Sequence, residues 1–138
     1  GAAIIIRNEN EQILLQERTD RNKWGLPGGC QDLGEDLRTT AVREAYEETG
    51  IILNPNDIEL IDTLSGENRK NSYPNGDIVY NNTSLYVADV NIQDAKDLKG
   101  DFETKRLQFF YPEEVPENLM DADLIKSYLN FIGKKRKF

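Results

Sequence analysis

The sequence contains no histidine and a single cysteine, Cys30, among its 138 residues. Without imidazole, no side chain of that type can act as general base, phosphate nucleophile or metal ligand, and one thiol cannot complete a zinc site of the usual nitrogen and sulfur type. The lone thiol cannot form an internal disulfide, and we expect Cys30 to be a small buried side chain rather than a nucleophile. Any bound metal is therefore expected to have oxygen ligands, which favour Mg²⁺ or Mn²⁺, with Ca²⁺ also allowed by ligand type.

Long hydrophobic runs are also missing. No stretch reaches the roughly eighteen apolar residues that a membrane span requires, and no charged leader followed by an apolar segment indicates secretion. We therefore expect no membrane partner, and the cytoplasm is the default compartment for a chain with one cysteine. The chain begins at Gly1 inside an apolar run rather than with methionine, so we expect some residues to precede it.

Positive charge is in short supply, because 17 Lys and Arg residues face 25 Asp and Glu residues and leave a net charge of −8. A field of this sign repels a polyanion such as duplex DNA, so no nucleic-acid polymer is expected as a partner. A small phosphorylated molecule could still bind once metal ions had neutralised it. The basic cluster at residues 134–137 is interpreted as a solvated helix end that compensates the helix dipole.

The length of the chain fits one domain, residues 1–138, that buries roughly two-thirds of its unfolded surface. Two apolar runs, Ala2–Arg7 and Gln12–Glu17, flank a polar turn and predict a β-hairpin. Further strands are expected at Ile58–Leu64, at Ile78–Val90 and at Glu103–Tyr111, with a loop over Ser65–Asn71 and a helix over Asp121–Ile132. Strands and helices therefore interleave, which predicts an α/β (α+β) chain with a mixed sheet.

The stretch Gly29–Ile51 is the most informative part of the chain. It reads as a loop that enters a helix near Asp36, and the helix ends at Gly50, where glycine can adopt the left-handed conformation. Three glutamates at positions i, i+3 and i+4 fall within an arc of about 100° on this helix. They are Glu44, Glu47 and Glu48.

The opposite side of the same helix carries a repeat that predicts its packing face. The repeat consists of Val42, Ala45, Tyr46 and Thr49. On the carboxylate side, like charges at this spacing cost a few tenths of a kcal/mol per pair, and Arg43 is the local residue that relieves them. A cation from outside the helix is therefore expected near the three glutamates.

The residues of this stretch follow the pattern G-x5-E-x7-R-E-U-x-E-E-x-G-U, in which U is aliphatic. The matching positions are Gly29, Glu35, Arg43, Glu44, Ala45, Glu47, Glu48, Gly50 and Ile51. This pattern resembles the Nudix box at every fixed position, with Ala45 as the loosest fit. Seven strictly typed positions would coincide by chance about once in 10⁸ windows, so a merely solvated acidic helix is a poor explanation.

The resemblance implies a Nudix fold, in which a mixed sheet is sandwiched between helices. It implies a metal-dependent hydrolase that uses Mg²⁺ or Mn²⁺ to cleave a pyrophosphate bond in a nucleoside diphosphate linked to another moiety. A nucleoside triphosphate, ADP-ribose and a nucleotide sugar remain open as substrates, and a homodimer is common in the family. The alternatives are a nucleotide-sensing domain, which generally shows eroded box carboxylates, and an acidic partner-binding domain.

The roles of individual box residues also follow from the resemblance. Glu44, Glu47 and Glu48 would hold the metal ions, and Glu35 would act as a further ligand or through a water molecule. Arg43 would hold the box carboxylates in place by ion pairing. The general base must be a carboxylate in a chain without histidine, and Glu47, Glu48 and Glu103 all remain candidates.

Residues outside the helix complete the predicted site. Arg18 ends the second strand ahead of a W-x-L-P-G-G segment, where a basic residue often faces substrate phosphate in the family, and Gly29 is assigned to substrate contact. Tyr73 is read either as part of a tight turn or as a ring that stacks on a base. Glu103 is matched to the extra carboxylate of many members, with Asp101 and Glu67 as competitors.

Overall fold

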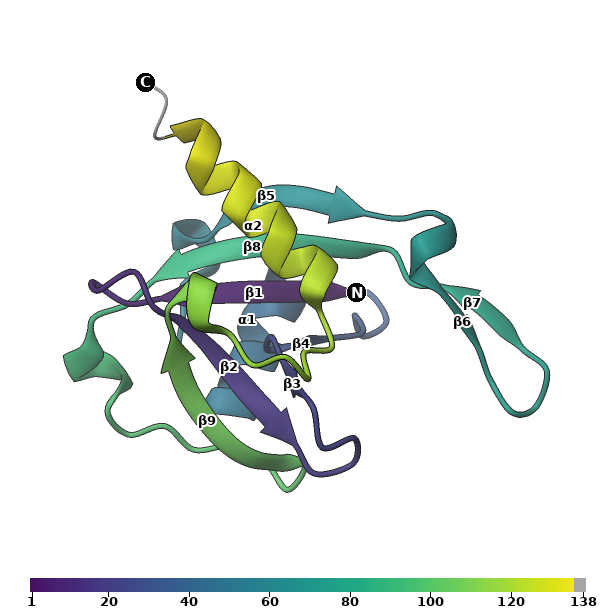
Figure 1. Ribbon diagram of the computed structural model, residues 1–138, viewed down its shortest axis with the longest axis horizontal. Coiled ribbons are helices and arrows are strands. Elements are labelled where there is room, and N and C mark those ends of the chain that lie inside the picture. The colour runs from purple at the N-terminus through teal and green to yellow at the C-terminus, as the bar shows by residue number, and fades with distance from the viewer. Residues whose placement is uncertain (136–138) are drawn as a thin grey trace.

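Strand β1 (Ala2–Arg7) lies in the middle of a mixed sheet in the computed structural model, which describes residues 1–135. It pairs in parallel with β8 (Thr83–Asp89) and antiparallel with β2 (Ile13–Arg18) and β4 (Gly28–Gly29). The order along the sheet is β3 (Trp24–Gly25), β2, β1, β8 and β5 (Glu59–Leu64), and β9 (Thr104–Phe110) pairs with β2 (Figure 1).

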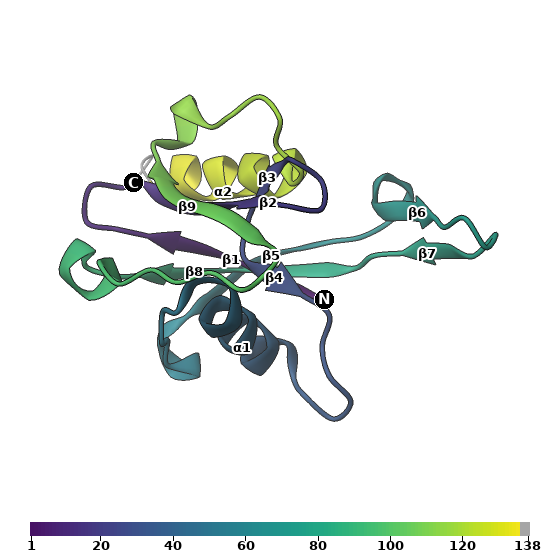
Figure 2. The same ribbon diagram turned by 90° about the horizontal axis from the view of Figure 1, so that it is seen from below.

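One helix covers each face of this sheet. Figure 2 shows α1 (Leu37–Thr49) on one side and α2 (Ala122–Lys135) on the other. Ile4 and Ile6 of β1 pack in the core on the α1 side, whereas Ile5 packs in the core on the α2 side. Burial on both faces explains why β1 is a nearly continuous apolar run rather than an alternating one. The predicted mixed sheet between helices is confirmed.

The two ends of α1 lie where local signals predicted them. The Asp36 side chain accepts a hydrogen bond from the backbone N–H of Thr39 at 2.8 Å, which caps the first turn. Gly50 closes the helix with φ of 80°, and its N–H donates to the Tyr46 carbonyl at 2.9 Å. The helix therefore begins and ends through contacts within its own segment.

The packing face of α1 differs from the predicted stripe. Tyr46, expected to pack inward, is 57% exposed, whereas Ala41 and Ala45 are fully buried against the sheet. The helix is rotated so that its small alanines meet the strands, and this rotation also brings Glu48 into the interior. The periodicity alone could not show that two alanines, rather than the larger tyrosine, set the distance between helix and sheet.

Two predictions between residues 65 and 90, one of a loop and one of a long strand, are wrong. The expected loop contains a short 3-10 helix, η2 (Glu67–Arg69), and strand β6 (Lys70–Ser72), while the expected long strand is divided into β7 (Ile78–Tyr80) and β8. β6 and β7 form a separate hairpin that projects from the body of the molecule (Figure 2). The predicted turn between them is confirmed, since the Tyr73 N–H donates to the Asp77 carbonyl at 2.8 Å.

Short 3-10 helices occupy several of the remaining connections. They are η1 (Pro55–Asp57), η3 (Ile92–Ala95) and η4 (Pro112–Glu114). Within residues 1–135, no helix combines the length and the apolar character that crossing a bilayer demands. The basic cluster predicted at residues 134–137 extends beyond the described residues.

Candidate active site

Two neighbouring glycines of β4 bring the backbone close to two different parts of the molecule. A Cβ on Gly28 would lie 2.5 Å from the Ala2 carbonyl oxygen, so this position lets β4 approach β1. A Cβ on Gly29 would lie 2.6 Å from Oε1 of Glu44, so here the helix side chain lies directly against the loop backbone. The first position of the box therefore sets how closely the loop and α1 approach.

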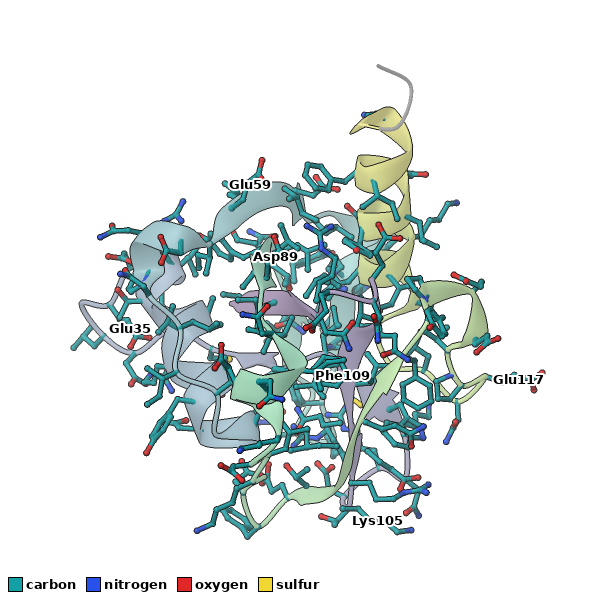
Figure 3. The ribbon with its side chains drawn as sticks, turned by 90° about the vertical axis from the view of Figure 1, so that its left-hand side faces the viewer. Glu35, Glu59, Asp89, Lys105, Phe109 and Glu117 are labelled. Atoms are coloured by element: carbon teal, nitrogen blue, oxygen red, sulfur yellow. The ribbon has the colours of Figure 1, made fainter. Side chains whose placement is uncertain are left out.

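Arg43 is the centre of a cluster of ion pairs at the start of the box. Its Nε lies 2.9 Å from Oε2 of Glu35, and its Nη1 lies 2.9 Å from Oε1 of Glu44 and 3.2 Å from Oε2 of Glu47. The Arg43 guanidinium, assisted by the Thr40 hydroxyl, lowers the pKa of Glu35 to about 2. Figure 3 shows Glu35 on the loop that enters α1, far from Glu117. The predicted ion pairing of box carboxylates by Arg43 is therefore present.

Glu48 is the carboxylate that the fold removes from solvent, with only 5% of the residue exposed. Burial raises its pKa to about 8, against the opposing effect of a hydrogen bond from the Gly28 N–H to Oε2 at 2.7 Å. The buried amide of Gln16 also hydrogen-bonds this carboxyl. Burial raises the pKa of the adjacent Glu44 as well, although Arg43 partly opposes that shift. Two carboxyls with raised pKa values therefore lie side by side.

Arg18 joins residues that are far apart in the sequence. Its Nη2 lies 2.7 Å from Oε2 of Glu103, its Nη1 lies 3.8 Å from Oε1 of Glu48, and its Nε lies 3.0 Å from Oδ1 of Asp20. Arg18 thus supplies the cation that was expected from outside the helix. Because its guanidinium faces three carboxylates here, it lies between the buried box glutamate and the start of β9.

Of the three candidates for an extra carboxylate, Glu103 is the one that contacts Arg18. Asp101 instead accepts hydrogen bonds from the Glu103 N–H at 3.0 Å and from the Thr104 hydroxyl at 2.9 Å, which orders the chain just before β9. Glu67 accepts a hydrogen bond from the Tyr80 hydroxyl at 3.2 Å, in the projecting hairpin. The structure therefore places Glu103, rather than its two competitors, beside the box.

A hollow of about 620 Å³ opens beside β4 and is lined by several of the predicted site residues. Arg18, Gly29 and Tyr73 all line it, so the three residues assigned to substrate contact share one surface. Its other basic residues are Arg21, Lys23 and Arg69. A local group of cations in a chain of net charge −8 is the arrangement expected for an anion site.

Three features of this region were not anticipated. Cys30 is exposed and lines the hollow, so the expectation that it is buried is wrong; it lies just after β4, where the chain leaves the sheet. Asp121 lies in the same hollow with a pKa raised by burial, and its Oδ2 accepts a hydrogen bond from the Leu26 N–H at 3.1 Å. Gln16 contacts Glu48 from β2, and its only sequence signal was a polar residue inside an apolar run.

Within residues 1–135, no three Asp, Glu or Cys side chains are gathered as ligands around a common point. Arg43 attracts Glu44 and Glu47, while Glu48 faces the Gly28 backbone. The donor set nevertheless fits a hard divalent cation, since the side-chain ligands that the box supplies are all carboxylates. A dication would also offset the cost of burying Glu48 beside Glu44.

Comparison with known proteins agrees with this geometry. Residues 1–131 match the family model described as the NUDIX domain. The chain is 54% identical over 50 residues to the "Putative 8-oxo-dGTP diphosphatase" of Bacillus subtilis, covering 36% of this chain and 34% of that protein. It is 28% identical over 130 residues to the ADP-ribose pyrophosphatase of Methanocaldococcus jannaschii, covering 92% and 70%.

A solved structure shows the same architecture. The MutT protein of Methanosarcina mazei Go1 superposes with a TM-score of 0.71 at 25% identity, covering 98% of this chain and 93% of that one. The chain belongs to the Nudix family, since the family model spans nearly all of it. The matches span about a third of the length of the Bacillus subtilis relative and less of several other curated relatives.

Proposed function

We propose that this chain is a metal-dependent Nudix hydrolase domain that cleaves a pyrophosphate bond in a nucleoside diphosphate linked to another moiety. The observation that carries the proposal is the buried carboxyl of Glu48, with a pKa raised to about 8, which contacts the Gly28 N–H and lies 3.8 Å from Arg18. Gly28 and Arg18 both line the hollow. A desolvated carboxyl that faces a specific charged partner next to a cleft is typical of functional sites rather than of solvated surfaces.

Mg²⁺ or Mn²⁺ held by Glu44, Glu47 and Glu48, with Glu35 as a further ligand or water-mediated contact, would neutralise phosphate charge and lower the pKa of a bound water. Arg43 keeps these carboxylates together when no cation is bound, because its guanidinium contacts Glu35, Glu44 and Glu47.

The protein's own groups orient the phosphates and handle the proton. Arg18, Arg21 and Lys23 line the hollow, so the phosphate chain is expected to lie along them, with its reactive phosphorus near Glu48. A carboxylate must accept the proton of the attacking water, and Glu47, Glu48 and Glu103 remain the candidates. Glu103 is available only if Arg18 releases it, since the two form an ion pair at 2.7 Å.

The substrate class follows from the site and from the relatives together. Relatives described as acting on 8-oxo-dGTP and on ADP-ribose share a nucleoside joined to a diphosphate, so that common part is what we assign to this chain. A nucleoside triphosphate, ADP-ribose and a nucleotide sugar are the compounds to be distinguished. We expect Tyr73, which is half-exposed and lines the hollow, to stack on the base.

The test is a screen of these nucleotides with Mg²⁺ and with Mn²⁺, scored by released phosphate, pyrophosphate or nucleoside monophosphate. We expect hydrolysis of at least one compound that depends on the metal and is abolished by a chelator. Tight nucleotide binding without any product would instead support the nucleotide-sensing alternative. A chain that neither binds a nucleotide nor gains thermal stability from either metal would contradict the proposal.

A further inference from the structure

Gln16 is a buried polar residue at an inward-facing position of β2, with 2% of the residue exposed. Because alternate residues of a strand face opposite sides, Gln16 faces the same side as Leu14. Leu14 packs with Ala41 and Ala45 of the box helix, so Gln16 also points into the α1 layer. An amide in this setting costs free energy unless both of its polar ends are hydrogen-bonded, and an apolar side chain would pack there without that cost.

Both ends of the Gln16 amide have partners, and one of them is the buried box glutamate. Oε1 of Gln16 lies 3.1 Å from the Thr104 hydroxyl on β9, which donates to it. The amide donates to the Glu48 carboxyl. Since the Thr104 contact places oxygen on the β9 side, the NH₂ group is directed towards Glu48. The orientation of the amide therefore follows from the pairing of β2 with β9.

The Glu48 carboxyl is consequently held from more than one direction. The Gly28 N–H donates to Oε2 at 2.7 Å, Gln16 donates from the strand behind it, and Arg18 lies 3.8 Å from Oε1. A carboxylate offers about four acceptor positions, so these contacts fix its plane and still leave room for a cation. Side chains that orient a metal ligand from behind commonly change metal affinity when they are replaced.

We propose that Gln16 is a positioning residue, whose amide holds the Glu48 carboxylate in the orientation that accepts a divalent cation. The inference rests on the proposed metal-dependent function and adds a residue outside the Nudix box to it. Gln16 does not touch the substrate or the ion; it acts through Glu48. The contact with Thr104 also links this position to the chain segment that carries Glu103.

The main test replaces Gln16 with methionine, which has a similar volume and no donor. Mn²⁺ affinity, measured by calorimetry and by electron paramagnetic resonance of free Mn²⁺, is expected to fall roughly 10- to 100-fold. Turnover should fall by a similar factor with KM for the nucleotide unchanged. The melting temperature in chelator is expected to fall modestly, because Glu48 and Thr104 lose a hydrogen-bond partner. A merely structural glutamine would lower this melting temperature and leave the Mn²⁺ affinity of the folded protein unchanged. Leu15→Met, on the opposite face of the same strand, is the matched control and should leave Mn²⁺ affinity unchanged.

A second variant covers the case in which Gln16→Met does not fold. Thr104→Val removes the donor to Gln16 Oε1, but the Thr104 hydroxyl has one proton and also faces Asp101, so we expect only a loss of about threefold in Mn²⁺ affinity. If every folded variant of this pair binds Mn²⁺ as tightly as the parent, the proposed role of Gln16 is wrong. Metal-dependent hydrolysis by the parent chain would be unaffected by that result. A parent chain that binds no Mn²⁺ overturns both this inference and the proposed function.

Discussion

Two hollows of nearly equal size lie on the surface, one beside β4 and one beyond the end of α1 at Gly50, and acidic residues line both. The one beside β4 measures about 620 Å³, and the one beyond Gly50 measures about 670 Å³ and is lined by Asp57, Asp94 and Asp97 among others. Those three aspartates are exposed, whereas Glu48 is buried and faces Arg18. The two hollows therefore differ not in volume or in negative charge but in the buried carboxyl of Glu48 and the cations next to the first one, which are the features expected of a functional site.

The largest expected difference between the two hollows is catalytic. Glu48→Gln keeps the shape of the side chain but removes its negative charge, and we expect turnover to fall by about three orders of magnitude or more. Mg²⁺-dependent product release is the measurement. Asp94→Asn, the same chemical change in the other hollow, should leave turnover within about twofold. Near-normal hydrolysis by a folded Glu48→Gln protein would show that the Glu48 carboxylate is not needed for catalysis.

The second expected effect is on the pH dependence of stability without metal. The pKa of Glu48 is raised from 4.5 to about 8 in the folded chain, so the folded state binds more protons than the unfolded state between these values. The free energy of unfolding contributed by Glu48 therefore falls as pH rises through this window, by an amount on the order of 3 kcal/mol at pH 7. Glu48→Gln removes this dependence and should be more stable than the parent at pH 7.

Thermal or urea unfolding in chelator, from pH 5 to pH 8, measures this effect. The difference between Glu48→Gln and the parent should grow with pH and level off near pH 8. Asp94→Asn should follow the parent at every pH, because Asp94 is exposed. Parallel stability curves for the parent and Glu48→Gln would mean that Glu48 is not desolvated as described.

A smaller effect is expected at the cation that holds the carboxylate cluster. Arg43→Met leaves Glu35, Glu44 and Glu47 without their shared partner. Because the Arg43 side chain still reaches solvent, we expect a loss of about 1–2 kcal/mol in the free energy of unfolding, or several degrees in melting temperature. Calorimetric melting in chelator is the measurement. Arg21→Met is the control. Arg21 is mostly exposed and its ion pair with Asp20 is long, at 4.0 Å, so the substitution should change the free energy of unfolding by less than about 0.5 kcal/mol.

The smallest expected effect concerns base contact at the rim of the first hollow. Tyr73→Leu removes an aromatic ring and should raise KM for the preferred nucleotide by about fivefold, since stacking on one base contributes roughly 1 kcal/mol. Turnover at saturation should be unchanged. Tyr80→Leu, on the same hairpin but outside this lining, should leave KM as it is. Equal KM values for the two variants would leave Tyr73 as a turn residue only.

The helix ends and the motif could be predicted because their signals are local. Asp36 caps the first turn and Gly50 closes the last, and neither contact needs the rest of the fold. The burial of Glu48 and the exposure of Tyr46 depend on how α1 rotates against the sheet, which no spacing within the helix determines. The hairpin β6–β7 was missed because residues 78–90 were read as one alternating strand, although the polar pair Asn81 and Asn82 separates β7 from β8.

The contacts that Arg18 and Gln16 make with Glu48 could not be predicted from sequence patterns either. Both residues lie on β2, and both meet Glu48 through a separation of about thirty residues along the chain that only strand and helix packing closes. The resemblance to the Nudix box supplied the identity of the carboxylates. The structure adds that Glu48 is the buried one and that Glu44 and Glu47 are paired with Arg43. It also shows that Thr104 of β9 hydrogen-bonds Gln16.

The two adjacent glycines of β4, Gly28 and Gly29, are needed for different reasons. At position 28 any larger residue would collide with the main chain of β1. That backbone cannot shift without disturbing the sheet, so the substitution would lower the stability of the fold. At position 29 the obstacle is only the tip of the Glu44 side chain, which can swing aside, so a methyl group there would leave a folded protein with a displaced acid. The opening glycine of the box therefore matters for the position of the Glu44 carboxylate, whereas its neighbour is required for the fold itself.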